Sequence, residues 1–268
     1  AIVGRPNVGK STLVNYFVGT KLSITSRKAQ TTRYQLLGIH SENDTQYIFV
    51  DTPGYQLRHL NMLNRGLNKT VQQALKDVDV ILFLIEPGVL DETDKKILNM
   101  IPEETPIVLA INKVDLMKDK AKLLGYIKEL DGIQRFEAIV PTSVKKANNL
   151  QPLMLALKSF LPEQAFIFPE DELTDKNEKF LSAEIVREKV FRLTGQELPY
   201  SIAVEIEKFE YVEGIRRIFA AIIVDRDSHK PMIIGKNGKR LKEISTSSRL
   251  DMEKLFGSKV WLEIWVKV

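Results

Sequence analysis

Short apolar runs alternate with helical patterns through the first part of the chain. Three of these runs contain no polar residue, which is typical of strands buried on both faces of a sheet: 48–50, 80–85 and 107–111. Between and after them, the spacing of apolar residues predicts helices over 11–18, 63–75, 94–101 and 150–161. Such alternation favours an α/β fold, with a mostly parallel sheet covered by helices on both faces.

Beyond residue 161 the pattern changes. Residues 162–177 lose the periodicity and contain two prolines and a run of acidic residues, so we expect a linker there. The rest of the chain predicts a helix, two strands, a helix and a strand, over 178–194, 202–206, 218–224, 239–256 and 260–266. A short apolar step at 232–234, of the kind seen in strands, precedes the second helix. We therefore expect two domains, an α/β domain at 1–161 and a small α+β domain at 178–268.

Composition excludes several classes of protein. Of the 268 residues, 44% are hydrophobic and 28% are charged, as in a globular protein rather than a disordered one. The absence of cysteine excludes disulfides and Cys-ligated metal sites. The longest apolar run, 78–90, is interrupted by polar residues and is too short to span a bilayer. Because no charged and apolar leader precedes Ala1, we expect a cytoplasmic protein.

The net charge of +4 is distributed unevenly. From Lys176 onward the chain carries eighteen Lys and Arg residues against fourteen Asp and Glu residues, whereas the preceding part balances. A basic terminal domain is either an ordinary solvated surface or the footprint of a polyanionic partner such as nucleic acid. The charge alone leaves both interpretations open.

A phosphate-binding loop is the most specific motif in the chain. It fits the pattern G-x-x-x-x-G-K-[ST] between a buried strand and a helix, with Gly4, Arg5, Pro6, Asn7, Val8, Gly9, Lys10 and Ser11. The glycines let backbone N–H groups surround phosphate oxygens at a helix N-terminus. In such loops the lysine reaches the β- and γ-phosphates and the hydroxyl holds Mg²⁺. Only three residues precede the loop, fewer than a buried strand needs, so we expect a few natural residues to be missing there.

A second motif selects the base. Asn112, Lys113, Val114 and Asp115 directly follow the apolar run 107–111. A carboxylate at Asp115 can accept both N1–H and the exocyclic amine of guanine, a donor pair that adenine lacks. Asn112 would hold the loop and face the base, and the stem of Lys113 would lie along the ring. The order of the two motifs predicts GTP and GDP as ligands.

With these motifs in place, residues 1–161 resemble the translation-factor class of small GTPases. The resemblance implies a third motif, whose first residue holds Mg²⁺ through water and whose glycine contacts the γ-phosphate: Asp51, Thr52, Pro53, Gly54 and, directly after it, Tyr55. It also implies a base-contacting motif, usually S-A-K, here formed by Ser143, Val144 and Lys145. A threonine of the mobile loop 30–33 is implied as a ligand of Mg²⁺ in the GTP state. We assign that role to Thr32, with Thr31 as its neighbour.

The catalytic residue of Ras-like enzymes has no counterpart in this sequence. Those enzymes place a water-orienting Gln directly after the glycine of the third motif, but Tyr55 stands there and Gln56 follows one place later. We therefore expect slow intrinsic hydrolysis, with charge supplied by an arginine such as Arg33 or Arg58, by a partner, or by a monovalent cation. In relatives with the same loop an Asn helps to bind K⁺, which makes Asn7 the candidate ligand here. The alternative is that Asn7 only shapes the loop.

A second candidate binding loop lies near the C-terminus. The segment 233–244 resembles the core of KH domains, I-I-G-x-x-G-x-x-[IL], in the element order of the type II fold. Such a loop clamps the backbone of single-stranded RNA, and the residues implied are Ile234, Gly235, Lys236, Asn237, Gly238, Lys239, Arg240 and Lys242. The alternative is an ordinary turn before a helix. Trp261 and Trp265 share one face of the last strand, where we favour packing over stacking on bases.

A phosphate-loop GTPase followed by a type II KH domain resembles the Era family of bacterial ribosome-assembly GTPases over nearly the whole chain. The resemblance implies binding to the 3′ end of small-subunit ribosomal RNA, a role in 30S assembly, and peripheral contact with the inner membrane. We expect a monomer, and a basic tail beyond Val268 in the natural chain. Two alternatives stay open. One is a KH module whose GTP-binding domain has negligible turnover, and the other is a related GTPase of RNA modification or general ribosome assembly.

Overall fold

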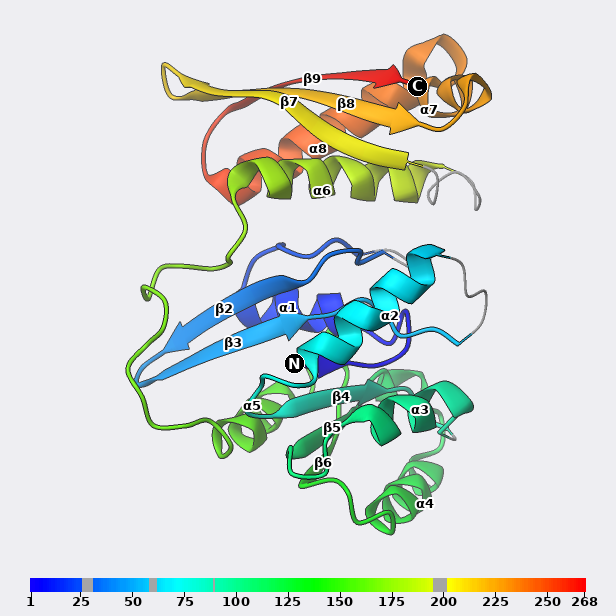
Figure 1. The fold of residues 1–268 in the computed structure, drawn as a ribbon, viewed down its shortest axis with the longest axis vertical. Coiled ribbons are helices and arrows are strands. Elements are labelled where there is room, and N and C mark those ends of the chain that lie inside the picture. Colours follow the sequence, from blue (N-terminus) through cyan, green and yellow to red (C-terminus); the bar gives the residue numbers. More distant parts are fainter. Residues whose placement is uncertain (26–30, 58–61, 89, 195–201) are drawn as a thin grey trace. The chain divides into compact units, whose positions relative to one another are not determined.

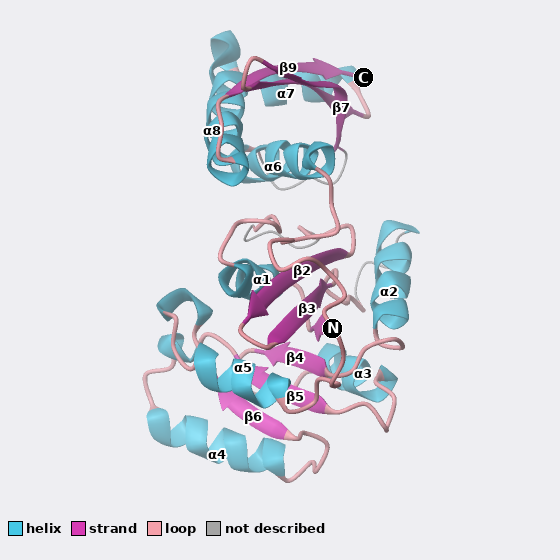
Figure 2. Cartoon of the chain, turned by 90° about the vertical axis from the view of Figure 1, so that its left-hand side faces the viewer, coloured by secondary structure: helices cyan, strands magenta, loops and turns pink. Residues whose placement is uncertain are grey.

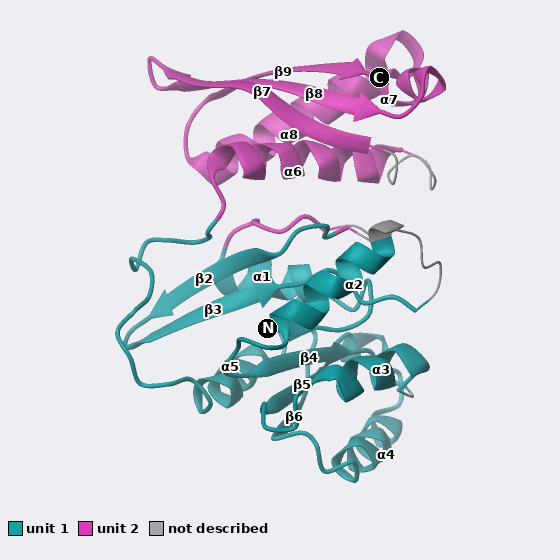
Figure 3. Ribbon diagram, in the orientation of Figure 1, with its two compact units in different colours: residues 1–19, 32–175 teal, residues 20–31, 176–268 magenta. Residues whose placement is uncertain are grey.

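The computed structural model describes residues 1–25, 31–57, 62–88, 90–194 and 202–268 (Figure 1). The chain forms two compact units (Figure 3). Unit 1 comprises Ala1–Gly19 and Thr32–Asp175, and unit 2 comprises Thr20–Thr31 and Lys176–Val268. The chain therefore passes from one unit to the other three times, after Gly19, after Thr31 and after Asp175.

Unit 1 is built on a six-stranded sheet with the order β2-β3-β1-β4-β5-β6. Its strands are β1 (Ile2–Val3), β2 (Leu36–Glu42), β3 (Thr45–Asp51), β4 (Ile81–Ile85), β5 (Ile107–Ile111) and β6 (Ala138–Pro141). β2 pairs with β3 in antiparallel register, and all the other pairs are parallel. The mostly parallel sheet expected from the sequence is confirmed.

Helices cover both faces of this sheet. They are α1 (Lys10–Val18), α2 (Met62–Ala74), α3 (Glu92–Met100), α4 (Lys120–Asp131) and α5 (Leu150–Lys158). Figure 2 shows α1 and α2 on opposite sides of the strands. Val71 of α2, Ile97 of α3 and Leu130 of α4 join one buried cluster with Phe83 of β4. In the described ranges, no helix combines the length and the hydropathy needed to cross a bilayer.

The parallel strands bring the nucleotide motifs to one edge of the sheet, because their carboxyl ends lie on the same side. The phosphate loop follows β1, and Asp51 is the last residue of β3. Asn112 comes directly after β5, and Ser143 follows β6. Motifs that are up to about 140 residues apart in the sequence are thus neighbours by topology.

The structure adds elements that the patterning of the sequence did not predict, namely β2, α4 and β6. It also gives structure to much of the segment 162–177, which was expected to be a linker. The backbone N–H of Ile39 in β2 donates to the carbonyl of Leu173 at 2.9 Å. The Gln46 side chain accepts hydrogen bonds from the N–H groups of Ile167 and Phe168, both at 3.0 Å. Most of this segment therefore packs along β2 and β3 as part of unit 1.

The described part of unit 2 contains three strands and three α-helices. Its strands are β7 (Ile202–Val212), β8 (Ile215–Val224) and β9 (Val260–Lys267), with β8 central, antiparallel to β7 and parallel to β9. Its helices are α6 (Glu178–Leu193), α7 (Lys230–Ile234) and α8 (Lys239–Phe256). Val186 and Val190 of α6, Ile244 and Met252 of α8, and Ile222 of β8 lie in one buried cluster.

One local expectation for unit 2 was wrong. The apolar step 232–234 is not extended but forms the end of α7. Pro231 stands in the first turn of that helix, where its fixed φ is favourable and its missing N–H costs nothing. The N–H of Gly235 closes the turn on the carbonyl of Pro231 at 2.8 Å. The step thus ends the helix that leads into the glycine loop.

Candidate nucleotide site and RNA-binding loop

The phosphate loop requires glycine at two positions. Gly4 has φ 152° and Gly9 has φ 111°, in the range that L side chains rarely adopt. A Cβ atom on Gly4 would lie 2.4 Å from the carbonyl oxygen of Leu84, and one on Gly9 would lie 2.3 Å from Nδ2 of Asn112. Any other residue would therefore push the loop away from β4 or from Asn112.

Lys10 lies inside this loop. Its ammonium donates to the carbonyl oxygens of Gly4 and Arg5 at 3.0 and 2.7 Å. The side chain is buried, and burial lowers the pKa of Lys10 to about 8, against an opposing contribution from Asp51. The loop thus holds a cation whose charge is poorly solvated and suited to a phosphate.

Three oxygen donors converge beside Lys10. The Ser11 hydroxyl donates to Oδ2 of Asp51 at 2.9 Å, and its Oγ lies 2.9 Å from Oγ1 of Thr32. These are the three residues that the sequence assigned to Mg²⁺. Hard oxygen ligands of this kind suit Mg²⁺, which is usually held by one or two protein groups plus phosphates and water. The donor set therefore fits the ion.

The third motif packs its backbone against the phosphate loop. A Cβ atom on Gly54 would lie 2.7 Å from the backbone of Pro6. The hydroxyl of Thr52 donates to the carbonyl of Ile2 at 2.7 Å, which ties the motif to β1. Pro53, two residues after the end of β3, is buried. Gly54 thus permits a close approach that no larger residue would allow.

The residues considered for a role in catalysis differ in their burial and in their contacts. The Tyr55 side chain is 5% exposed and belongs to the core cluster of unit 1, so it is not a water-orienting group. The backbone of Gln56 is held by Asn68, whose amide accepts from its N–H at 3.1 Å and donates to its carbonyl at 2.8 Å. Arg33 lies in the described part of the chain, whereas Arg58 lies outside the described residues.

Asn112 connects three of the motifs. Its Nδ2 donates to the carbonyl of Val8 at 2.8 Å, and its Oδ1 accepts from the N–H of Val144 at 3.1 Å. Lys113 donates to the carbonyl of Asn7 at 2.7 Å and pairs with Glu86. These contacts hold the base-contacting loops against the phosphate loop.

Asp115, the candidate for reading guanine, is oriented by the other base-contacting motif. The Ser143 hydroxyl donates to Oδ1 of Asp115 at 2.6 Å. Val144 is buried and contributes its backbone, whereas Lys145 is exposed. The structure therefore brings together the residues of both motifs that the sequence placed around the base.

Sequence reasoning missed a support of the phosphate loop. The Arg5 guanidinium donates to Asp91 at 2.8 Å and to Asp94 at 3.0 Å, at the N-terminus of α3. The same two carboxylates cap α3 reciprocally. Burial raises the pKa of Asp94 to about 6, although Arg5 opposes the shift. The capping pattern D-x-x-D was visible in the sequence, but nothing in it pointed to Arg5.

The glycine loop of unit 2 has the conformation that its sequence requires. Gly235, Asn237 and Gly238 have φ 74°, 54° and 71°. A Cβ atom on Gly235 would lie 2.7 Å from Cβ of Arg240, whereas one on Gly238 would meet nothing within 4 Å. Ile234 and Arg240 are half-buried, and the exposed side chains are those of Lys236, Asn237, Lys239 and Lys242.

The two tryptophans of β9 lie on the face of the sheet opposite the buried cluster of unit 2. Trp261 is 46% exposed and contacts Phe219 of β8, with ring centroids 5.1 Å apart. Phe219 also receives the ammonium of Lys208 at 5.6 Å from its centroid. Trp261 is thus packed on one side and exposed on the other.

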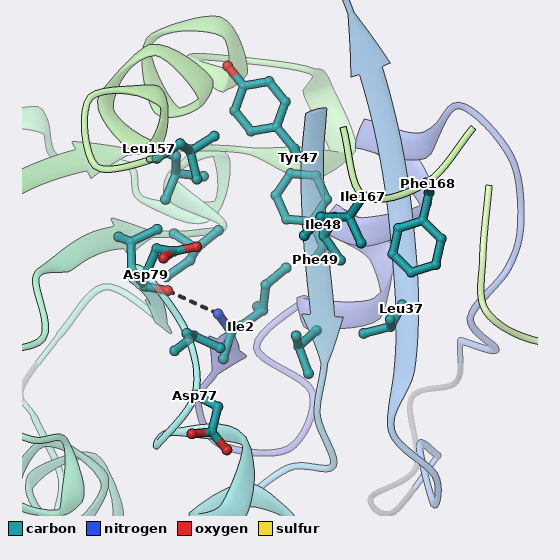
Figure 4. Close-up of a pocket in the computed structure, with 16 residues that line it drawn as sticks. Ile2, Leu37, Tyr47, Ile48, Phe49, Asp77, Asp79, Leu157, Ile167 and Phe168 are labelled. Atoms are coloured by element: carbon teal, nitrogen blue, oxygen red, sulfur yellow. Dashed lines mark hydrogen bonds between the residues drawn. The ribbon is translucent and has the colours of Figure 1, made fainter. Parts of the chain in front are cut away.

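A cavity of about 380 Å³ lies in unit 1 but holds none of these motif residues (Figure 4). It is lined by apolar side chains such as Ile2, Tyr47, Phe49 and Leu157. Val80, whose carbonyl accepts from the Ala1 amine at 3.0 Å, lies at its edge. These are the amino ends of β1 and β4, whereas ligands of parallel sheets bind at the carboxyl ends. This cavity is therefore not the candidate nucleotide site.

Two family models match different parts of this chain. Residues 1–113 match the family model of the 50S ribosome-binding GTPase, and residues 197–268 match the family model of the KH domain. The GTPase Era of Chromobacterium violaceum and that of Nitrosomonas eutropha are each 50% identical over all of this chain and 90% of their own length. The GTPase Era of Coxiella burnetii is 49% identical over all of this chain and 91% of its own length.

Solved structures give the same result. A crystal structure of Era in complex with MgGDPNP and nucleotides 1506–1542 of 16S ribosomal RNA matches with TM-score 0.93 and 42% identity, over all of this chain and 91% of the other. A single-residue variant of Aquifex aeolicus Era bound to GDP·AlF4⁻ matches with TM-score 0.94 and 42% identity, over all of this chain and 92% of the other. With relatives of 50% identity over its full length, the chain belongs to the Era family of GTPases.

Proposed function

We propose that this GTPase is a nucleotide-dependent switch that binds the 3′ end of small-subunit ribosomal RNA and assists assembly of the 30S subunit. The observation that carries the proposal is the likeness, over the whole chain, to an Era structure that contains nucleotides 1506–1542 of 16S ribosomal RNA. The exposed basic residues of the glycine loop, Lys236, Lys239 and Lys242, supply the cations that such a partner needs.

GTP binds at the carboxyl edge of the unit 1 sheet. The N–H groups of the phosphate loop and the ammonium of Lys10 hold the phosphates, and Asp115 accepts the N1–H and the amine of guanine. Ser11, Thr32 and, through water, Asp51 would hold Mg²⁺, which neutralises charge on the β- and γ-phosphates when bound. The presence of MgGDPNP in the related Era structure supports this assignment.

Hydrolysis is slow in the isolated protein, because Tyr55 is buried where a water-orienting Gln would stand. Asn7 would help to hold K⁺, which would supply at this place the charge that an arginine finger supplies elsewhere. Asn7 has φ 65° and accepts from Lys113 through its carbonyl, so its backbone is held in the loop. The contribution of arginine fingers is about 10³–10⁵ in rate.

RNA binding is tested by reversing charge in the glycine loop. We expect the double variant Lys236→Asp and Asn237→Asp to bind single-stranded RNA at least about 100-fold more weakly than the wild type. Its affinity for GTP should be unchanged. A matched control, Lys254→Asp with Thr246→Asp, introduces the same charge change at exposed positions of α8, away from the glycine loop. The probe is an RNA corresponding to nucleotides 1506–1542 of 16S ribosomal RNA. Equal loss in both variants would mean that only overall charge matters.

Two further roles rest on the family resemblance and not on any described residue. They are peripheral contact with the inner membrane and action as a monomer. Flotation with vesicles and analytical ultracentrifugation, respectively, test them.

A further inference from the structure

Directly after the third motif, a single side chain of α2 binds the backbone of the chain. Oδ1 of Asn68 accepts from the N–H of Gln56 at 3.1 Å, and Nδ2 of Asn68 donates to the carbonyl of Gln56 at 2.8 Å. One amide thus makes both of the hydrogen bonds that a residue of a neighbouring antiparallel strand would make. The course of the backbone at residue 56 is therefore set by α2.

The needs of α2 itself do not explain an asparagine at this position. Asn68 stands at the middle of the helix and is 8% exposed. Asparagine is less favourable than leucine inside a helix, and a buried amide is costly unless it is hydrogen-bonded. The nearby buried positions of the same helix, Leu67 and Val71, are apolar. An apolar residue at position 68 would suit the helix better, so the bonds to Gln56 account for the amide.

The residue before Gln56 connects this contact to the phosphate loop. The side chain of Tyr55 lies in the same buried cluster as Val71 of α2. The N–H of Tyr55 donates to the carbonyl of Gly4 at 3.4 Å, and the same carbonyl accepts from the ammonium of Lys10 at 3.0 Å. All of these residues belong to unit 1. Within that unit, α2 thus holds the two residues that link the third motif to the cation of the phosphate loop.

The other side of the third motif is held as well. The hydroxyl of Thr52 donates to the carbonyl of Ile2 in β1 at 2.7 Å. Gly54 therefore lies between two anchored stretches of backbone, and a Cβ atom on it would lie 2.7 Å from the backbone of Pro6. The position of the Gly54 backbone beside the phosphate loop depends on both anchors, of which Asn68 supplies the second.

We propose that Asn68 is a positioning residue for GTP hydrolysis: by binding the backbone of Gln56, it holds the third motif, including Gly54, against the phosphate loop. The inference deepens the proposed function and rests on the expected contact of Gly54 with the γ-phosphate. A backbone that is already fixed at Gly54 lowers the ordering cost that would otherwise fall on the reaction. Because GDP has no γ-phosphate, Asn68 matters for the reaction of GTP and not for the binding of GDP.

The test uses the full chain and the variant Asn68→Leu, which keeps the volume of the side chain and removes both hydrogen bonds to Gln56. We expect single-turnover hydrolysis at saturating GTP to slow about tenfold, because two hydrogen bonds that hold the motif are lost. The affinity for GDP should stay within about twofold of the wild type. In the absence of nucleotide, the amide hydrogen of Gln56 should exchange faster than in the wild type. Asn68→Gln keeps the amide and should recover part of the rate.

A matched control separates this role from general effects of changing an amide on α2. The amide of Gln72, on the same helix, is exposed and donates to Sδ of Met100 in α3 at 3.6 Å. Gln72→Leu should leave both the hydrolysis rate and the exchange at Gln56 unchanged. If Asn68→Leu does not fold, Asn68→Asp keeps the acceptor for the N–H of Gln56 and removes the donor to its carbonyl. We expect this variant also to hydrolyse GTP more slowly than the wild type.

The outcomes distinguish the inference from the function beneath it. Wild-type hydrolysis in folded Asn68→Leu and Asn68→Asp, together with slow hydrolysis in Gly54→Ala, would overturn the positioning role alone. An unchanged rate in Gly54→Ala would overturn the expected role of Gly54 and the inference with it. An equal loss of GDP affinity and of rate in Asn68→Leu would mean that Asn68 only supports the fold. A tenfold loss of rate with unchanged GDP affinity and faster exchange at Gln56 would support the inference.

Discussion

At the scale of single residues, the nucleotide site is a set of side chains that orient one another. Asn112 joins the phosphate loop to the loop of Val144, and Ser143 orients Asp115 at 2.6 Å. Lys113 reaches back to the carbonyl of Asn7. A substitution in one motif therefore changes the hydrogen bonds that orient the others. For this reason, nucleotide affinity, base choice and hydrolysis rate must be measured separately for each variant.

Base choice is tested at Asp115. Asp115→Asn should lose about 100-fold or more in affinity for GTP, because an unmatched hydrogen-bond pair is left in the site. The variant should gain affinity for xanthosine triphosphate, whose C2 oxo group replaces the amine. Competition binding with both nucleotides measures the exchange. Unchanged GTP affinity in the variant would contradict the assignment of Asp115.

The protonation of Lys10 is tested through pH. Burial lowers its pKa to about 8, from 10.5 in the unfolded chain, so the ammonium is destabilised in the folded protein without nucleotide. The folded state then binds fewer protons than the unfolded state between about pH 8 and 10.5, and this group adds stability as pH rises through that window. Phosphate binding restores the charged form, so GTP binding should take up a proton above about pH 8.

Calorimetry in buffers of different ionisation enthalpy measures this uptake. We expect a fraction of a proton to be taken up at about pH 8.5 and much less at about pH 7, with GTP affinity falling as pH rises above about 8. Binding without proton uptake at the higher pH would show that Lys10 keeps its charge in the free protein.

Asn7 is tested by the choice of salt. Single-turnover hydrolysis should be faster in K⁺ than in Na⁺ at equal ionic strength, because a fixed cation beside the transferred phosphate stabilises the transition state. Asn7→Ala should remove the difference and keep most of the GTP affinity, since Lys10 and the backbone of the loop remain. Equal wild-type rates in the two salts would return attention to Arg33, Gln56 or a partner.

At the scale of elements, the glycine loop offers a matched pair of substitutions. Gly235→Ala brings its Cβ within 2.7 Å of Arg240, whereas Gly238→Ala meets nothing and bears only the cost of its positive φ. We expect Gly235→Ala to lower the unfolding free energy of unit 2 by about 1–3 kcal/mol and Gly238→Ala by about 1 kcal/mol. Urea unfolding followed by tryptophan fluorescence reports on unit 2 alone, because Trp261 and Trp265 both lie there. Equal losses in the two variants would contradict the steric account.

Most of the element order could be predicted because buried parallel strands have a strong signal. The runs 80–85 and 107–111 became β4 and β5, and the four predicted helices of unit 1, now α1, α2, α3 and α5, were recovered within a few residues. β2 was missed because it is an edge strand with polar His40, Ser41 and Glu42 in its second half. The extended reading of 232–234 failed because three apolar residues cannot distinguish a strand from the last turn of a helix.

The candidate site followed the same rule. Residues in contiguous motifs could be predicted because one short stretch of sequence contains both the residues that shape the loop and the residues that bind the ligand. The contacts of Arg5 with Asp91 and Asp94 could not, since they join segments almost 90 residues apart with no pattern in common. The contacts of Thr25 and Thr31 with α6 were hidden for the same reason, at separations of more than 150 residues.

At the scale of the whole molecule, the chain passes between its units three times, and two of these passages flank the segment before Thr32. An ordinary two-domain chain has one such connection. The central claim is that unit 2 binds one particular RNA through its glycine loop.

Crosslinking of the chain to total bacterial RNA, followed by sequencing of the bound fragments, tests this claim most directly. We predict that the fragments concentrate at the 3′ end of small-subunit ribosomal RNA, and that they fall to background in the double variant Lys236→Asp and Asn237→Asp. Fragments spread over cellular RNAs in proportion to their abundance, or an unchanged pattern in the double variant, would contradict the account.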